Sequence, residues 1–331
     1  MNLDDTNGIK ILGTGSATPE VCVSNTRLSQ LVDTSDDWIA SRTGIKQRKI
    51  VGEHESLVSL AVRASLQAIE HANLRAIDIE LIILATSTPD DLFGSASQVQ
   101  AEIEATNAFA FDLTAACSGF VLGFVTAAQF LKSSSYQNAL VIGADVLSEW
   151  IDWSDRKTCV LFGDGAGAVV LAKSLRNSLV GFDMKTDGTK RSHLQIVSKR
   201  KLTYLNQEFT FNKSQYEFLN MNGKEVYKFA VSQIPTLIKT CLHKNNLTTQ
   251  DIDWLLLHQA NERILHAVAE RLDVPGNKVL KNLENYGNTS AASIPIVLDE
   301  AVRSQQIQTD DLIVISGFGA GLTWGVVILR W

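Results

Sequence analysis

The chain has 331 residues, of which 45% are hydrophobic and 20% are charged, with a mean hydropathy of +0.04. These values predict a folded protein with a large core, built as one large domain or two fused domains, and they exclude a disordered or fibrous chain. The net charge is −6, and the basic run Lys199-Arg200-Lys201 fits a solvated loop, so the sequence carries no general signature of nucleic-acid binding.

Neither an export signal nor a membrane span is evident in the sequence. The first ten residues, MNLDDTNGIK, are polar and acidic, whereas a secretory signal has basic and then apolar residues. The apolar run 119–130 is too short and too interrupted by glycine to cross a bilayer. The four cysteines lack a C-x-x-C spacing, which argues against a zinc site or a disulfide framework and favours a reducing compartment: Cys22, Cys117, Cys159 and Cys241.

Two stretches of the chain, 173 residues apart, resemble each other. A helical pattern over 56–72 is followed by the apolar run 81–84, and a second helical pattern over 226–243 is followed by the run 254–257. Pro235 lies inside the second helix and predicts a kink. Short apolar strands that alternate with helices predict β-α-β units, here built twice. Because the strands are continuously apolar, both faces of each sheet are expected to be covered.

Cys117 lies in the run DLTAACSGF (112–120), where a strand pattern ends and a helical pattern begins. A helix N-terminus favours the thiolate, although a lone cysteine in an apolar segment is more often buried and inert. A helix and the strand 140–143 follow Cys117 much as a helix and the strand 312–315 follow Asn288. We therefore predict that Asn288 is the duplicate of Cys117 and that both lie near the pseudo-twofold axis of a five-layered α-β-α-β-α sandwich.

Two further segments could supply partners for the cysteine. His258 opens HQAN (258–261) at the end of strand 254–257, where open α/β sheets bind ligands, and Asn288 lies in NYGNTSAASIP (285–295). Taken alone, the histidine could be structural and the asparagine a helix cap. The glycines of GFGAGLTWG (317–325) would let backbone N–H groups approach a ligand, as an oxyanion hole requires. Those of FGDGAGA (162–168) predict a tight turn and close strand packing.

Together these segments resemble the β-ketoacyl-acyl carrier protein synthase III family of the thiolase-like superfamily, the initiating condensing enzymes of fatty acid synthesis. The resemblance covers nearly the whole chain and rests on motifs that occur in family order: GTGSATPE, DTSDDWIASRTGI (33–45), DLTAACSGF, DWSDRKT (152–158), FGDGAGA, HQAN, NYGNTSAAS and GFGAGLTWG. The segment TSTPDDLFGSA (86–96) is similar to the sequences of the cyanobacterial and plastid branch of this family. The resemblance implies a thiolase-like α/β sandwich made of two duplicated halves, residues 1–175 and 176–331.

The resemblance also implies an acyltransferase with a catalytic triad of Cys117, His258 and Asn288. Cys117 would take an acyl group, most simply from acetyl-CoA, and backbone N–H groups of Cys117 and Ala320 would bind the oxyanion. His258 and Asn288 would donate to the enolate that malonyl-acyl carrier protein forms on losing carbon dioxide. The product would be acetoacetyl-acyl carrier protein. No metal or redox cofactor is implied, and we expect a homodimer in the cytoplasm or the plastid stroma.

Other residues are expected to bind substrates by the same resemblance. Trp38 and Arg156 would hold the adenine of coenzyme A, Arg42 its phosphates, and Asn261 would lie along the pantetheine tunnel.

Three basic residues and one aromatic residue are expected to contact proteins. Lys228, Arg263 and Arg271 would form a basic patch for the acidic carrier protein, or else be solvated helix surface. Phe93 would line the acyl pocket across a dimer interface. The chain departs from the family at two positions: Glu270 stands where a second basic residue is common, and Ala320 where many members have glycine.

The sequence leaves two rival functions open. A related enzyme of secondary metabolism could use the same triad with another acceptor, and a thiolase-fold protein could persist as a non-catalytic subunit. A thiolase is disfavoured because GFGAGLTWG has no second cysteine, and an elongating synthase because a histidine would replace Asn288.

Overall fold

The computed structural model describes residues 8–204 and 210–331, and it contains two five-stranded sheets; residues 1–7 of the acidic N-terminal stretch lie outside the described part. The first sheet has the order β1 (Gly8–Ala17), β7 (Gly165–Ser174), β6 (Asn138–Asp145), β4 (Leu81–Ala85) and β5 (Phe109–Leu113). The second has the order β8 (Leu179–Thr186), β16 (Thr323–Arg330), β15 (Leu312–Gly319), β13 (Trp254–Leu257) and β14 (Val279–Leu280). In both sheets the first three strands are antiparallel and the last two pairings are parallel, which confirms the predicted duplication.

The repeat of 173 residues has a local structural cause. Asn73 and Asn246 each follow a helix in the left-handed conformation, at φ 54° and 56°, which asparagine tolerates better than most residues. A short 3₁₀ turn follows each of them. The carboxylates of Asp78 and Asp251 cap these turns by accepting N–H bonds three residues earlier, at 2.9 and 2.7 Å. Each turn then leads into a buried parallel strand.

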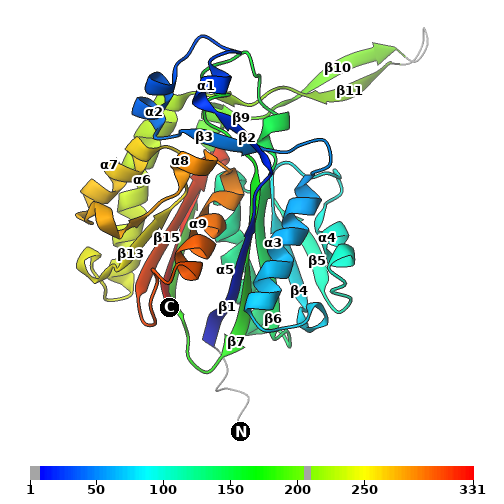
Figure 1. Cartoon of the computed structure of the whole chain (residues 1–331). Helices are drawn as coiled ribbons and strands as arrows, with labels where there is room; N and C mark the ends of the chain where they lie inside the picture. Colours follow the sequence, from blue (N-terminus) through cyan, green and yellow to red (C-terminus); the bar gives the residue numbers. More distant parts are fainter. Residues whose placement is uncertain (1–7, 205–209) are drawn as a thin grey trace.

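Helices cover both sheets and separate them, which gives five layers (Figure 1). The outer layers are α3 (Leu57–His71) with α4 (Ala96–Glu102), and α6 (Gly223–Lys244) with α7 (Glu262–Leu272). The central layer holds α5 (Gly119–Ser133) and α9 (Ser293–Arg303), which pack against strands of both sheets. The apolar composition of α5 is thus explained by its place between the sheets. The five-layered prediction is confirmed.

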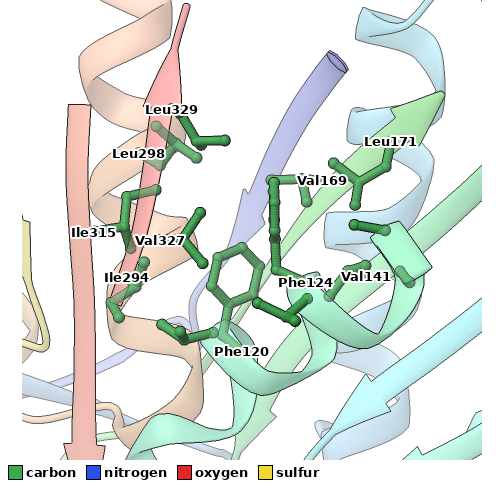
Figure 2. Packing of buried hydrophobic residues seen from close by; sticks show 14 of the residues in the cluster. Phe120, Phe124, Val141, Val169, Leu171, Ile294, Leu298, Ile315, Val327 and Leu329 are labelled. Atoms are coloured by element: carbon green, nitrogen blue, oxygen red, sulfur yellow. The ribbon is translucent and has the colours of Figure 1, made fainter. Parts of the chain in front are cut away.

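Alternate residues of the strands face different layers. In β15, Ile313 and Ile315 join the central core, whereas Leu312 and Val314 pack towards α6 and α7. Figure 2 shows the central core, where Phe120 and Phe124 of α5 lie between residues of both sheets. The strands are continuously apolar because both of their faces are buried.

Helix α6 continues through Pro235, and its buried residues Ile234, Leu237 and Ile238 pack against the second sheet and hold the helix in place. One detail of the elements differs from the sequence-based expectation. The basic triplet 199–201, expected in a loop, lies on an exposed strand, β10 (Ser198–Tyr204), which pairs with β11 (Thr210–Tyr216).

The remaining short elements lie above the sheets and shape the site. They are β2 (Val21–Ser24) paired with β3 (Gln47–Ile50), β9 (Leu194–Gln195) paired with β12 (Asn220–Met221), and the helices α1 (Asn25–Leu28), α2 (Asp36–Thr43) and α8 (Leu283–Tyr286).

Candidate active site

Cys117 lies in a 3₁₀ turn, Ala116–Ser118, that joins β5 to α5 and begins with Ala116 at φ 47°. A matching turn, Ser290–Ala292, precedes α9 and begins with Ser290 at φ 51°. The counterpart of Cys117 is therefore Ala291. The prediction that Asn288 duplicates the cysteine is wrong, because Asn288 precedes the second turn by two residues.

The two turns contact each other. The Ser290 hydroxyl donates to Cys117 Sγ at 3.3 Å. Gly319 of β15 lies against the cysteine so closely that a β-carbon there would be 2.8 Å from the backbone nitrogen of Cys117. On the other side, a β-carbon at Gly143 would be 2.2 Å from the Ala291 carbonyl oxygen. Glycine at both positions lets β15 and β6 approach the two turns this closely.

The Cys117 thiol is buried. Burial raises its pKa from 9.0 to about 12, the hydrogen bond from Ser290 opposes the rise, and the carboxylate of Asp145 adds to it. Burial thus acts against the helix N-terminus, which favours the thiolate.

His258 follows β13 and is held as a neutral ring. Its backbone N–H bonds to the Ser316 carbonyl of β15 at 2.9 Å, and its Nδ1 lies 2.7 Å from the Ser293 hydroxyl. The Ser293 oxygen also accepts the backbone N–H of Gln259 at 3.3 Å, and donation of the Ser293 hydroxyl proton to Nδ1 corresponds to the tautomer with the ring proton on Nε2. Burial lowers the pKa of His258 from 6.5 to about 3. A neutral donor results.

Asn288 is fixed through its carbonyl oxygen and its backbone. Oδ1 accepts the backbone N–H of Ser290 at 2.9 Å. Its backbone N–H donates to the Leu161 carbonyl at 2.9 Å, and its own carbonyl accepts from the Gly163 N–H at 3.0 Å. The side chain is only 6% exposed, and its amide nitrogen is left to donate to a ligand.

Cys117, His258 and Asn288 line one cavity of about 440 Å³. The structure thus brings the three predicted catalytic residues together from three elements: the turn before α5, the end of β13 and the turn before α9.

The mouth of this cavity is aromatic and cationic. The guanidinium carbons of Arg42 and Arg156 lie 4.5 and 5.3 Å from the ring centre of Trp38. Asn261 caps α7, and its Nδ2 donates to the Arg42 carbonyl at 3.1 Å, which ties α7 to α2. All four residues predicted to bind coenzyme A line the cavity, and Lys157 lies there as well.

The three residues predicted to dock the carrier protein occupy different environments. Arg263 lines the cavity mouth and donates to the Ser41 carbonyl at 3.0 Å. Arg271 donates to the Val231 carbonyl of α6 at 2.8 Å, and Lys228 pairs with Glu225 at 2.8 Å. Each cation thus already has one internal partner.

A second cavity, of about 660 Å³, meets the first at Cys117. Its lining is mostly apolar and includes Leu92, Leu147 and Ala320. Ala320 does not have a positive φ, so its β-carbon is tolerated in the glycine-rich turn; Gly321, at φ 125°, takes the strained position. Phe93, which was expected at an acyl pocket, is 99% exposed and does not line this cavity within its own chain.

Three residues of the site escaped the sequence analysis: Ser290, Ser293 and Asp145. The two serines belong to the run NTSAAS, which was considered only as the start of a helix. Asp145 ends β6 and is fully buried. Nothing in the local sequence indicates that these side chains point at the cysteine and the histidine.

Family profiles and curated proteins match the chain. The family profile described as 3-oxoacyl-[acyl-carrier-protein] synthase III matches residues 111–188, and the profile of its C-terminal part matches residues 242–331. Proteins named β-ketoacyl-[acyl-carrier-protein] synthase III from Trichormus variabilis and Porphyra purpurea are 57% and 54% identical over 324 residues, which is 98% of this chain and 98% and 99% of theirs.

Solved structures agree as well. The 3-oxoacyl-[acyl-carrier-protein] synthase III of Aquifex aeolicus is 42% identical, with a TM-score of 0.89 over 98% of this chain and all of that one. The priming β-ketosynthase of the R1128 polyketide pathway is 31% identical, with a TM-score of 0.90 over all of this chain and 98% of that one. These likenesses confirm the expected fold and family. The chain belongs to the β-ketoacyl-[acyl-carrier-protein] synthase III family.

Proposed function

We propose that this enzyme condenses acetyl-CoA with malonyl-acyl carrier protein to give acetoacetyl-acyl carrier protein, coenzyme A and carbon dioxide. The observation that carries the proposal is the shared cavity: a buried thiol and two neutral donors, Cys117, His258 and Asn288, lie behind a cationic and aromatic mouth.

In the first half of the reaction, Cys117 Sγ attacks the thioester carbonyl of acetyl-CoA. Backbone N–H groups at Cys117 and Ala320 bind the oxyanion, and the tetrahedral intermediate collapses to acyl-Cys117 and coenzyme A. Trp38 and Arg156 hold the adenine between them, and Arg42 faces the phosphates. The support for this placement is that these side chains already stack on one another at the cavity mouth.

In the second half, malonyl-acyl carrier protein loses carbon dioxide and leaves an enolate. The His258 Nε2–H and the Asn288 Nδ2–H donate to the enolate oxygen, and the enolate carbon attacks the acyl-Cys117 carbonyl. Cys117 then leaves as a thiolate. A neutral histidine suits this role because it donates a hydrogen bond without transferring a full proton to the enolate.

The acyl group is proposed to enter the second cavity, which is completed by a second copy of the chain. Strand β5 is an edge strand of the first sheet, and Phe109 at its start is 54% exposed. The nearby segment carries Leu92, 79% exposed, and Phe93, 99% exposed. Unpaired edges and large exposed apolar side chains are typical of an interface, so a homodimer is proposed, with Phe93 of one chain at the acyl cavity of the other.

The carrier protein is proposed to approach the cavity mouth. Arg263 supplies a cation there, and Lys228 and Arg271 lie on the adjoining α6 and α7. Each of these cations uses only part of its N–H groups in bonds within the chain, so further N–H donors remain for the acidic carrier protein. The chemistry calls for no metal or redox cofactor, because neutral donors stabilise both anions. It requires a reduced Cys117, which suits the cytoplasm or the plastid stroma.

One experiment tests this function. The enzyme is incubated with isotopically labelled acetyl-CoA, the label is located by peptide mass, and malonyl-acyl carrier protein is then added. We expect label on Cys117, none on Cys117→Ala, and labelled acetoacetyl-acyl carrier protein on addition of the second substrate. Absence of label on Cys117 contradicts an acyltransferase, whereas label without condensation points to the secondary-metabolism alternative with another acceptor.

A further inference from the structure

The backbone of Asn288 is held by a segment that lies far away in the chain, residues 160–163. The Asn288 N–H donates to the Leu161 carbonyl at 2.9 Å, and the Asn288 carbonyl accepts the N–H of Gly163 at 3.0 Å. Phe162 and Asn288 thus form a short parallel bridge. A shift of this segment would move Asn288 and, with it, the side-chain amide that is proposed to donate to the enolate.

A buried arginine, Arg48 of β3, holds the same segment. Its side chain is fully buried, and its Nη2 donates to the Val160 carbonyl at 2.8 Å. Its Nη1 donates to the Val23 carbonyl of β2 at 3.0 Å. Because Val23 is also the residue that pairs with Arg48 across β2 and β3, the guanidinium ties the segment to a paired strand.

Arg48 has no counterion among residues 8–204 and 210–331. Within these residues no aspartate or glutamate forms an ion pair with it, and its third nitrogen, Nε, is buried without a hydrogen-bond partner. Burial lowers the pKa of Arg48 from 12.5 to about 10, which leaves it a cation at neutral pH. A buried cation without an anion is costly for the fold. Its planar fork of donors can, however, hold two carbonyl groups in a fixed geometry, which favours a role in positioning.

The packing around Arg48 also leads to Asn288. A β-carbon at Gly163 would lie 3.2 Å from the β-carbon of Arg48, and a β-carbon at Gly287 would lie 3.3 Å from it. Gly163 donates to Asn288, and Gly287 precedes Asn288 in the chain at φ 69°. Arg48 therefore packs against both glycines that adjoin the bridge.

We propose that Arg48 is a positioning residue for Asn288: its guanidinium fixes the segment 160–163, and this segment fixes the donor amide of Asn288 in the catalytic cavity. The inference rests on the function proposed above. Val160, Leu161 and Phe162 line the cavity, whereas Arg48 does not. Arg48 thus acts only through the residues that it holds.

The test uses Arg48→Met, which removes the donors and keeps a long side chain, with Arg303→Met as a matched control. Arg303 also donates to a backbone carbonyl, that of Thr14 at 3.0 Å, but it lines neither cavity. Decarboxylation of malonyl-acyl carrier protein and acylation of Cys117 are measured in both variants, with and without Asn288→Ala. Denaturant unfolding reports the stability of each variant.

Arg48→Met should lower the rate of decarboxylation by about 10- to 100-fold, the cost of displacing a catalytic group by about 1 Å, while acylation of Cys117 stays within about threefold. In the Asn288→Ala background, Arg48→Met should cause no further loss of decarboxylation, because no donor is left to be displaced. Arg303→Met should keep both rates within about twofold, as expected for a distant and independent site, even where it lowers stability.

Three results overturn the inference while the proposed function stands. They are decarboxylation at the wild-type rate in Arg48→Met, an equal loss of acylation and decarboxylation in that variant, and a loss that persists undiminished in the Asn288→Ala background. The last two would show a general structural role. If Asn288→Ala alone leaves decarboxylation unchanged, the proposed function fails and the inference falls with it.

Should Arg48→Met fail to fold, Arg48→Lys is measured in its place. Lysine keeps the cation but has one nitrogen where Arg48 uses two, so it cannot hold both carbonyl groups in the same geometry. A loss of decarboxylation that disappears in the Asn288→Ala background supports the inference, and an unchanged rate or a loss that persists contradicts it.

Discussion

Burial determines the chemistry of His258 at the scale of a single residue. The ring lies beside Phe318, with ring centres 5.2 Å apart in an edge-on arrangement, and is 1% exposed. It therefore stays neutral and donates a hydrogen bond where an exposed histidine would titrate.

This burial predicts an unusual dependence of stability on pH. The pKa of His258 is lowered from 6.5 in the unfolded chain to about 3 in the folded protein, so between these values the unfolded state binds one proton more. The free energy of unfolding of the wild type, relative to His258→Asn, should fall by about 1.4 kcal/mol per unit as the pH is lowered from 6.5. Denaturant unfolding of both proteins across this pH range measures the difference in their free energies of unfolding. A difference that does not change with pH contradicts a neutral, buried His258.

Ser293 is predicted to fix the tautomer of His258. Ser293→Ala removes the hydroxyl that supplies a proton to Nδ1, so the ring can place its proton there and lose its donor at Nε2. Decarboxylation of malonyl-acyl carrier protein should fall by about 10- to 100-fold, with acylation of Cys117 preserved. Ser304→Ala, on the exposed end of α9, is the control. Decarboxylation at the wild-type rate in Ser293→Ala would show that the tautomer is set by another group.

The sequence was sufficient to predict that Cys117, His258 and Asn288 share one site because each stands in a distinctive run, at the end of a strand for the first two and before α9 for the third. It could not reveal how strongly Cys117 is desolvated, since burial depends on the whole core. Ser290, Ser293 and Asp145 were missed for a similar reason. Their roles depend on contacts between segments that are 35 to 173 residues apart.

At the scale of elements, β15 packs against the turn Ala116–Ser118 that carries Cys117. Gly319 has an extended backbone, at φ −169°, which any residue can adopt, so only space restricts this position. A β-carbon there would lie 2.8 Å from the nitrogen and 3.1 Å from the β-carbon of Cys117.

Gly319→Ala should therefore displace the nucleophile. We expect a loss of stability of about 1–3 kcal/mol from overpacking, together with a fall in acylation of Cys117, measured by mass spectrometry after mixing with acetyl-CoA. Gly188→Ala is the control, because nothing lies within 4 Å of a β-carbon at that exposed position. Acylation at the wild-type rate in Gly319→Ala would contradict the proposed role of this contact.

The elements were largely predictable from the repeat. Asn73 and Asn246 end equivalent helices, and the apolar runs that follow them are β4 and β13. The connections that follow β5 and β14 differ in length between the two halves. For this reason the repeat seen in the sequence aligned Asn288 with Cys117, whereas the structure aligns Ala291 with it. Helix α6 runs through Pro235 because its tertiary packing outweighs the local cost of a proline.

At the scale of the whole molecule, the sandwich buries α5 and α9 between two sheets (Figure 1), and the two turns that precede these helices contact each other. The same architecture leaves β5 at the edge of the first sheet. An edge strand next to exposed apolar side chains is the structural basis for the proposed dimer.

Phe93→Asp should weaken that dimer. If Phe93 is inserted into the partner, a buried charge replaces an aromatic anchor, and the dissociation constant should rise by about 30-fold or more, corresponding to about 2 kcal/mol. Analytical ultracentrifugation measures the change, and acylation should fall with it. Leu175→Asp, which alters another exposed apolar residue in the link between the two sheets, should have no effect. A dimer of unchanged strength in Phe93→Asp contradicts the proposed interface.

The central claim is that residues of one cavity perform two separate tasks: Cys117 carries the acyl group, and His258 and Asn288 stabilise the enolate. The most direct measurement is of both half-reactions in His258→Ala and Asn288→Ala, with acylation followed by mass and decarboxylation by release of labelled carbon dioxide. Each variant should lose about 10²- to 10³-fold in decarboxylation, the effect of removing one oxyanion donor, while acylation of Cys117 is largely retained. An equal loss in both half-reactions would contradict the account.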